Sequence, residues 1–218
     1  PRDVMLNSAL DLLCHRDNYR CCSHVDTPVL KVGSAYRASA PPDVGWISED
    51  DVTVVLYGAP LLKLNGWCRP SARQVVERFR DRGRESLFEL DGTFLVVVVD
   101  RRNGILLVVN DRIGSIPLTH AQTPDEVAFA PEAKSLFSLL MVRPRLDEES
   151  VVSFLNLGYP IGDRTMFESI RLLEPASVLA VDLSTARCTV DRYWDLRFSP
   201  SNRFALRDAA NELSAVMA

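Results

Sequence analysis

Apolar residues recur at intervals of three and four positions in several segments of the chain, and this spacing predicts amphipathic helices. The helices expected from it cover 5–13, 69–83, 132–140, 147–157 and 204–217. Local signals place some of their ends. Pro70 stands near the first position of the second helix, which Gly83 ends. Asp147 is expected to accept hydrogen bonds from the free amides that begin the fourth helix, which Gly158 closes.

Runs of β-branched and apolar residues predict the strands. They cover 29–36, 53–57, 94–100, 105–109, 127–130, 177–183 and 189–194, with loops over 38–45 and 197–203. The clearest pair is the hairpin made by 94–100 and 105–109, because Asn103-Gly104 between them suits a two-residue type I′ turn. Both strands are apolar on both faces, which predicts an internal sheet that is covered by a layer on each side.

The predicted helices and strands are mixed along the chain. The strands are joined as antiparallel hairpins, and strand, helix and strand do not alternate regularly. We therefore expect an α+β domain built of layers, with two packed antiparallel sheets.

The composition argues against several classes of function. The 218 residues are 47% hydrophobic and 25% charged, which is the balance of an ordinary globular domain. The net charge of −4 gives no attraction toward nucleic acid or an anionic membrane. The longest apolar runs, 94–99 and 104–109, fall far short of the roughly 20 residues that a membrane-spanning helix needs.

The chain contains five cysteines, Cys14, Cys21, Cys22, Cys68 and Cys188. An odd number without a repeating spacing, in a chain long enough to bury its own core, predicts reduced thiols in a cytoplasmic protein. Three of them cluster with His15 and His24, and zinc prefers thiolate and imidazole ligands. The spacing matches no zinc-binding pattern, so thiols without metal are expected and a zinc site is the alternative.

Three sequence blocks follow one another in a fixed order. They are Leu90-Asp-Gly-Thr-Phe94, Asn110-Asp-Arg-Ile-Gly-Ser-Ile-Pro-Leu118 and Phe129-Ala-Pro-Glu-Ala-Lys134. These blocks resemble motifs of class II glutamine amidotransferase domains. The segment that runs from Phe154 through Gly158-Tyr-Pro-Ile-Gly162 to Asp195 resembles the end of that domain in asparagine synthetases.

The resemblance implies a fold and a chemistry. The fold is that of the N-terminal-nucleophile hydrolases, a four-layer αββα sandwich of two antiparallel sheets. The chemistry is that of a glutaminase, in which the thiol of an N-terminal cysteine attacks the side-chain amide of glutamine and an Asn-Gly pair stabilises the oxyanion. An arginine and an aspartate of the family hold the α-carboxylate and the α-amine of the substrate.

This sequence departs from the family's pattern at most of these positions. The opening strand and its cysteine are expected to be missing ahead of Pro1. Arg37 matches the carboxylate-binding arginine, Tyr57 stands at the oxyanion asparagine with Gly58 retained, and Ser71 stands at the aspartate. The resemblance therefore implies no catalytic residue here and a vestigial substrate site of Arg37, Tyr57, Gly58 and Ser71. Alternatively, Arg37 is an ordinary surface arginine and Tyr57 packs the emptied pocket.

The resemblance also implies two domains. Residues 1–198 correspond to the amidotransferase-like domain, which lacks its first strand, and residues 199–218 to the start of a synthetase domain that lies outside this sequence. In the family that second domain binds ATP and Mg through a Ser-Gly-Gly-x-Asp-Ser loop, whose backbone amides hold phosphate. This sequence contains no such loop, so no cofactor is expected on the chain itself.

Together these expectations describe a non-hydrolysing glutaminase-like domain at the N-terminus of an asparagine-synthetase-like enzyme that forms amide bonds with ATP. Lasso-peptide cyclases and β-lactam synthetases are relatives in which the substrate supplies the amine. One alternative is a glutamine-hydrolysing asparagine synthetase whose N-terminal cysteine lies outside this chain. Another is an inert module for dimerisation or peptide binding. The expected partners are the chain's own synthetase domain, then a second copy or a peptide substrate.

Overall fold

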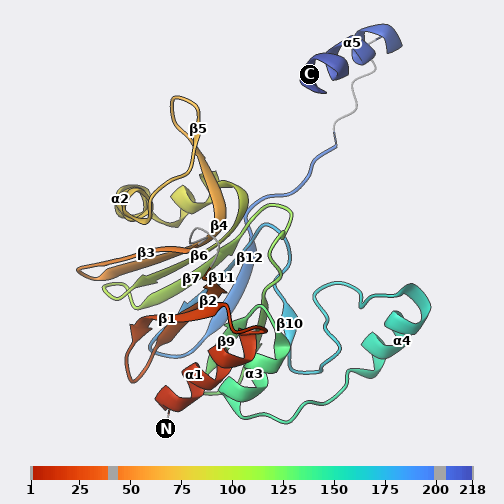
Figure 1. Ribbon diagram of the computed structural model, residues 1–218. Coiled ribbons are helices and arrows are strands. Elements are labelled where there is room, and N and C mark those ends of the chain that lie inside the picture. Colours follow the sequence, from red (N-terminus) through yellow and green to blue (C-terminus); the bar gives the residue numbers. More distant parts are fainter. Residues whose placement is uncertain (1, 39–43, 199–204, 218) are drawn as a thin grey trace.

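The computed structural model describes residues 2–38, 44–198 and 205–217, and its centre is an antiparallel sheet of seven strands (Figure 1). Six strands follow the order β12-β11-β7-β6-β4-β3, and β5 pairs with β4. Their bounds are β3 (Val44–Glu49), β4 (Val52–Lys63), β5 (Trp67–Cys68), β6 (Asp91–Asp100), β7 (Ile105–Asn110), β11 (Ser177–Asp182) and β12 (Cys188–Arg192). The predicted strands over 53–57, 94–100, 105–109, 177–183 and 189–194 are thereby confirmed.

A second layer of strands faces one side of this sheet. It holds the pair β1 (Tyr19–Asp26) and β2 (Lys31–Arg37) and a three-stranded sheet in the order β10-β8-β9, formed by β8 (Thr119–Gln122), β9 (Val127–Ala130) and β10 (Arg171–Leu172). Buried side chains of both parts, such as Val32 and Leu118, share one cluster with Val55 and Val108 of the large sheet. Two packed antiparallel layers are therefore present, as predicted.

Helices cover the outer faces of both layers: α2 (Ala72–Arg82) and the 3-10 helix η1 (Gly83–Glu89) on the large sheet, and α1 (Arg2–Leu13) and α3 (Ala133–Leu140) on the second layer. Two further helices, α4 (Glu148–Leu157) and α5 (Leu206–Met217), stand away from the sheets (Figure 1). On the large sheet, α2 places Val76 and Phe79 in a buried cluster with Val98. On the second layer, α1 and α3 lie side by side, and the Ser135 hydroxyl donates to the Ala9 carbonyl (3.1 Å; Figure 1). The order helix, sheet, sheet, helix is the predicted αββα sandwich.

The central hairpin is buried on both faces. Phe94, Val96 and Val98 are 0% exposed and lie in the cluster beneath α2, whereas Val99 is 1% exposed and packs toward the second layer. Val97 is only half-buried, because its side chain borders a cavity between the layers. The predicted covering of this sheet on both sides is confirmed.

The turn of this hairpin differs from the prediction. Strands β6 and β7 pair as far as Asp100 and Ile105, so the connection is the four-residue loop 101–104 rather than a two-residue type I′ turn. The Asp100 carboxylate accepts hydrogen bonds from the backbone N–H (3.0 Å) and the side-chain amide (2.6 Å) of Asn103. Only Gly104 in this loop takes a positive φ, +64°. The carboxylate thus organises a wider loop than the sequence pair suggests.

Side chains cap the starts of two helices. The Ser71 hydroxyl accepts a hydrogen bond from the Gln74 N–H, and the Gln74 side chain accepts one from the Ser71 N–H, so Ser71 is the N-cap of α2. Pro70 therefore directly precedes the cap and lies two residues before Ala72, near the first helical position as predicted. Asp147 caps α4 as predicted, by accepting from the Ser150 N–H (3.0 Å). The glycines that follow α2 and α4 end both helices, also as predicted.

Strand β1 is absent from the sequence-based prediction. Its sequence, Tyr-Arg-Cys-Cys-Ser-His-Val-Asp, lacks the apolar alternation that marks a strand. The predicted loop 38–45 ends earlier than expected, because β3 begins at Val44. Residues 39–43 of this loop lie outside the residues that the structure describes. Residues 199–203 of the second predicted loop also lie outside them.

None of the described helices is long and apolar enough to cross a membrane.

Candidate functional site

The predicted substrate-site residues lie on β4, at the start of α2 and at the end of β2. In β4, Tyr57 pairs with Leu95 and Gly58 pairs with Phe94 of β6. Successive residues of a strand point to opposite faces of the sheet. Tyr57 therefore lines the space between the two layers, whereas Gly58 borders a hollow beside α2. The two neighbours do not share a pocket.

The backbone at Gly58 requires glycine. Its φ is +93°, and a Cβ atom at this position would lie 2.4 Å from the carbonyl oxygen of Thr93 in β6. The Gly58 carbonyl accepts a hydrogen bond from Arg69 Nη2 (2.6 Å). Arg69 contacts the predicted site, although the sequence does not indicate it as part of that site. Its position in the sequence, just before α2, indicates only that a helix is about to begin. Close packing against β6 therefore accounts for this glycine.

The hollow beside α2 brings together two of the predicted residues. It has a volume of about 410 Å³ and is lined by Gly45, Trp46, Ile47, Leu56, Gly58, Pro60, Arg69, Pro70, Ser71, Ala72 and Arg73. The Ser71 hydroxyl in its wall is occupied by the cap of α2 and lies 3.2 Å from Gln74 Oε1. The described lining residues include no carboxylate, and one of their two guanidinium groups, that of Arg73, pairs with Glu49 (Nη1–Oε1 2.6 Å). The described lining therefore offers no acceptor of opposite charge to an ammonium group.

Arg37 stands apart from the other predicted residues. It is the last residue of β2, pairs with Tyr19 of β1 and is exposed. Among the described residues it belongs to the lining of neither the hollow nor the cavity between the layers. The four predicted residues therefore occupy three places: Tyr57 in the cavity, Gly58 and Ser71 at the hollow, and Arg37 at the end of β2.

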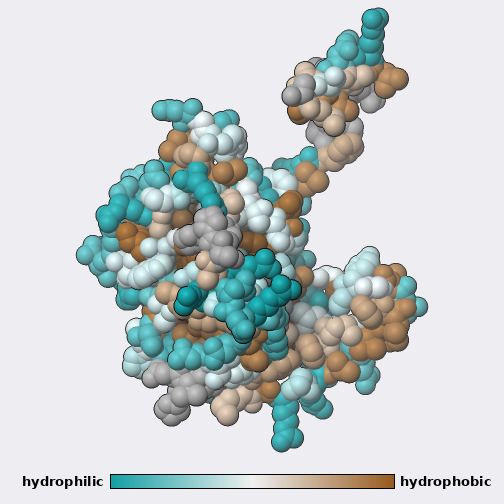
Figure 2. All heavy atoms as spheres, viewed as in Figure 1, coloured by the Kyte–Doolittle hydropathy of each residue, from teal (hydrophilic) through white to brown (hydrophobic). Residues whose placement is uncertain are grey.

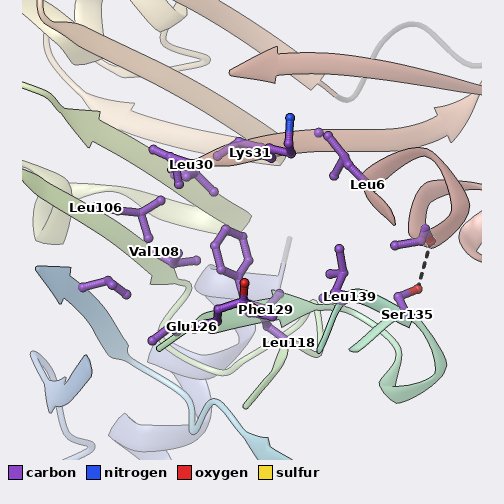
Figure 3. A pocket seen from close by; sticks show the side chains of 18 of the residues that line it. Leu6, Leu30, Lys31, Leu106, Val108, Leu118, Glu126, Phe129, Ser135 and Leu139 are labelled. Atoms are coloured by element: carbon purple, nitrogen blue, oxygen red, sulfur yellow. Dashed lines mark hydrogen bonds between the residues drawn. The ribbon is translucent and has the colours of Figure 1, made fainter. Parts of the chain in front are cut away.

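The cavity between the layers has a volume of about 670 Å³ and is largely apolar (Figure 3). Leu106 and Val108 of β7 line it from the large sheet, Leu6 and Leu139 line it from α1 and α3, and Phe129 points into it from β9. We call this space the inter-layer cavity. Strands β2 and β9, which both line it, are the outermost strands of their sheets. The inter-layer cavity can therefore take an extended segment or an apolar ligand.

A trio of polar side chains lies at the inter-layer cavity, where His15 and Glu132 belong to the lining and Lys134 contacts Glu132 from outside it. His15 Nε2 lies 2.6 Å from Glu132 Oε1, and Lys134 Nζ lies 3.0 Å from Glu132 Oε2. Burial by itself would raise the pKa of Glu132, but hydrogen bonds from His15 and Lys134 outweigh it and lower that pKa. The sequence does not indicate this trio, because His15 and Glu132 lie far apart along the chain and meet only when α1 packs beside α3.

The cysteines and histidines that cluster in the sequence do not form one group in the structure. His15 turns to Glu132, whereas His24 Nε2 lies 2.8 Å from the hydroxyl of Ser34. Burial lowers the pKa of His24. The two histidines therefore serve separate contacts, and neither joins the thiols of Cys14 and Cys21, which lie together.

Comparison with known proteins identifies related sequences. A family model described as a glutamine amidotransferase domain matches residues 71–194, more than half of the chain. Asparagine synthetase (glutamine-hydrolyzing) 2 of Bacillus subtilis strain 168 is 24% identical over 194 residues, which cover 80% of this chain and 26% of that protein. The chain thus spans about a quarter of the length of this relative.

Two solved structures are similar at low identity. The glutamine phosphoribosylpyrophosphate amidotransferase of B. subtilis, in complex with ADP and GMP, gives a TM-score of 0.43 at 15% identity and covers 74% of this chain and 34% of its own. An allosteric regulatory enzyme of purine biosynthesis gives a TM-score of 0.41 at 13% identity, with 73% and 32% covered.

Proposed function

This chain belongs to the family of glutamine amidotransferase domains, and on that basis we propose that it is a non-hydrolysing member, the N-terminal domain of an asparagine-synthetase-like enzyme that forms amide bonds with ATP. The similarity to an asparagine synthetase, of which the chain spans about a quarter, supports this enzyme class. In this proposal the bond-forming step belongs to a second domain, and the present domain is a scaffold and one wall of the substrate site.

One observation carries the proposal: the positions that would bind glutamine serve other purposes. Where the family has an asparagine, Tyr57 places its ring against the inter-layer cavity. Where the family has an aspartate, the hydroxyl of Ser71 caps α2. Losing a single oxyanion donor typically lowers turnover by roughly 10²–10³-fold, so these replacements argue against glutamine hydrolysis at this site.

The lining of the hollow beside α2 supports the same conclusion. The α-amine of glutamine is a cation and needs an acceptor of opposite charge. The described lining of the hollow contains no carboxylate that could supply it. Arg37 could still bind a carboxylate, but it lies outside the hollow at the exposed end of β2.

We propose that the amine nitrogen comes from the substrate that the enzyme joins to the activated carboxylate, and not from glutamine. An enzyme that forms an amide without ammonia from glutamine must take the nitrogen from the molecule that it joins. This is the chemistry of lasso-peptide cyclases and β-lactam synthetases, the relatives of asparagine synthetases in which the substrate supplies the amine. ATP and Mg would bind to the synthetase domain that begins after residue 198, with a carboxylate activated there and attacked by the substrate amine.

Exposed apolar side chains on α4 are the proposed contact with that synthetase domain, and those on α5, which follows residue 198, are proposed to pack inside it. Figure 2 shows apolar side chains gathered on both helices. The large exposed ones are Val152, Phe154, Leu155 and Leu157 on α4, Tyr159 and Ile161 just after it, and Leu206, Leu213, Val216 and Met217 on α5. Apolar surface gathered in this way typically marks a contact with another folded unit. A second copy of the chain or a peptide substrate is the further candidate for this surface.

A second function, glutamine hydrolysis by a cysteine that precedes Pro1, is favoured by the inter-layer cavity. Strands β2 and β9 border the cavity and end their respective sheets. An added strand could pair with these edges and fill the apolar space between them. A cysteine at the start of such a strand would then be the nucleophile that the family uses.

Glutamine labelled with ¹⁵N at its side-chain amide distinguishes the two functions. We expect no labelled ammonia from residues 1–218 or from the full-length gene product, and an unlabelled amide when the full-length enzyme converts its own substrate. The physical reason is the replacement of the oxyanion and amine-binding groups at Tyr57 and Ser71. The measurement is mass spectrometry of the ammonia and of the amide product.

Two results would contradict this expectation. Labelled ammonia from the full-length protein that stops when an N-terminal cysteine is alkylated would establish glutamine hydrolysis in place of our proposal. Labelled ammonia from residues 1–218, again abolished by a thiol alkylator, would show that one of the five cysteines of this chain acts as the nucleophile.

A further inference from the structure

Two cysteines that the proposed function does not use lie side by side at the end of α1. Cys14 directly follows α1, where its N–H donates to the Asp11 carbonyl (3.0 Å), and Cys21 lies in β1. Both are free thiols, and their Sγ atoms are 3.0 Å apart. Because a disulfide bond is about 2.05 Å long, the two sulfurs lie only about 1 Å farther apart than they would in that bond.

We propose that Cys14 and Cys21 form a modification site, a reversible intramolecular disulfide that is made by a small-molecule disulfide such as oxidised glutathione. The proposal goes beyond the function proposed above and does not depend on it. Cys21 is exposed and Cys14 is partly exposed, so the oxidant can reach the pair. Once one sulfur has reacted, the other is already beside it, and ring closure proceeds at a high effective concentration.

The reaction consists of two thiol–disulfide exchanges. The Cys14 thiolate attacks one sulfur of oxidised glutathione, forms a mixed disulfide and releases one glutathione. The sulfur of Cys21 then attacks Cys14 Sγ, forms the bond between Cys14 and Cys21 and releases the second glutathione. Two electrons and two protons pass from the protein thiols to the oxidant, which leaves as two thiols.

The two thiols affect each other. Although Cys21 is exposed, contact with surrounding protein atoms raises its pKa to about 12, and the hydrogen bond and charge of Cys14, together with the charge of Asp11, add to the rise. When Cys14 enters the mixed disulfide its charge disappears, which removes one cause of the raised pKa and favours the attack by Cys21.

The geometry selects Cys21 over its neighbour Cys22. Adjacent residues of a strand point to opposite faces, so Cys22 is turned away from Cys14, and its Sγ lies 3.9 Å from His24 Nδ1. Cys68 and Cys188 lie on β5 and β12, in the other sheet layer. A single pairing is therefore expected from five cysteines.

The disulfide would tie down one wall of the inter-layer cavity. Leu6 and Leu10 of α1 line the cavity. Helix α1 already lies close to β2, because a Cβ atom at Gly33 would be 2.8 Å from Leu10 Cδ1. A bond between the end of α1 and β1 closes the short loop 14–21 and limits movement of this helix. Oxidation would thus make the cavity wall more rigid, and reduction would release it.

The test starts from the fully reduced chain and treats it with oxidised glutathione under native conditions. The five titratable thiols should fall by two, to three, and the mass should fall by about 2 Da through loss of two hydrogens. A reducing agent should restore both values. Trypsin cleaves after Arg16 and Arg20, between the two cysteines, so peptides 3–16 and 21–31 should be recovered joined by a disulfide.

Single variants identify the pair. Cys14→Ser and Cys21→Ser should leave the two peptides unlinked, whereas Cys22→Ser is the matched control and should still link them. Circular dichroism establishes that each variant is folded. Five thiols retained by the wild-type chain, a glutathione adduct that persists without ring closure, or linked peptides in the Cys21→Ser variant would each overturn the proposal.

Discussion

Val97 and Val98 are neighbours in β6, yet Val98 is 0% exposed beneath α2 and Val97 is half-buried at the inter-layer cavity. At the residue scale this difference is testable. Val98→Asp leaves a buried carboxylate without a partner, and we expect it to lower the free energy of unfolding by about 3–5 kcal/mol in urea titrations. Val97→Asp is the matched control and should cost less, because its side chain keeps some exposed surface. Equal losses would contradict the burial of β6 beneath α2.

At the scale of the element, the start of α2 depends on Ser71, whose hydroxyl accepts from the Gln74 N–H. Ser71→Ala removes this acceptor, so the free energy of unfolding should fall by about 1 kcal/mol. Ser71→Asp keeps an acceptor and places a negative charge at a helix N-terminus, where charge of that sign is favourable, so its urea midpoint should stay close to the wild-type value. If both variants lose the same stability, capping is not the contribution of Ser71.

At the scale of the whole molecule, the chain is expected to need its synthetase domain to bind nucleotide. Calorimetric titration of residues 1–218 with Mg-ATP should give no heat of binding, because a phosphate site of the expected type needs a glycine-rich loop that presents backbone amides at a helix start. The sequence contains no Ser-Gly-Gly-x-Asp-Ser loop. The full-length protein is the positive control and should bind. Micromolar binding by residues 1–218 would contradict both this prediction and the domain boundary placed after residue 198.

Local patterns in the sequence were sufficient to predict most elements of the fold. The β-branched runs of β6 and β7, the N-cap at Asp147 and the strand over 127–130 all depend on residues close together in the chain. The two apolar faces of the hairpin also required a covering layer on each side, and α2 and the second layer provide them. Such features follow from the sequence because strand formation, capping and burial are decided by neighbouring side chains.

Only the tertiary structure decided how these elements meet. The pleat of β4 sends Tyr57 and Gly58 to opposite faces, the packing of α1 beside α3 brings His15 to Glu132, and the path from α1 into β1 brings Cys14 to Cys21. The four-residue loop after Asp100 also escaped prediction, since a side-chain carboxylate rather than the Asn-Gly pair organises it. The sequence by itself thus determined the kinds of element and the family. The positions of the site residues depended on contacts between layers, whose geometry no local pattern contains.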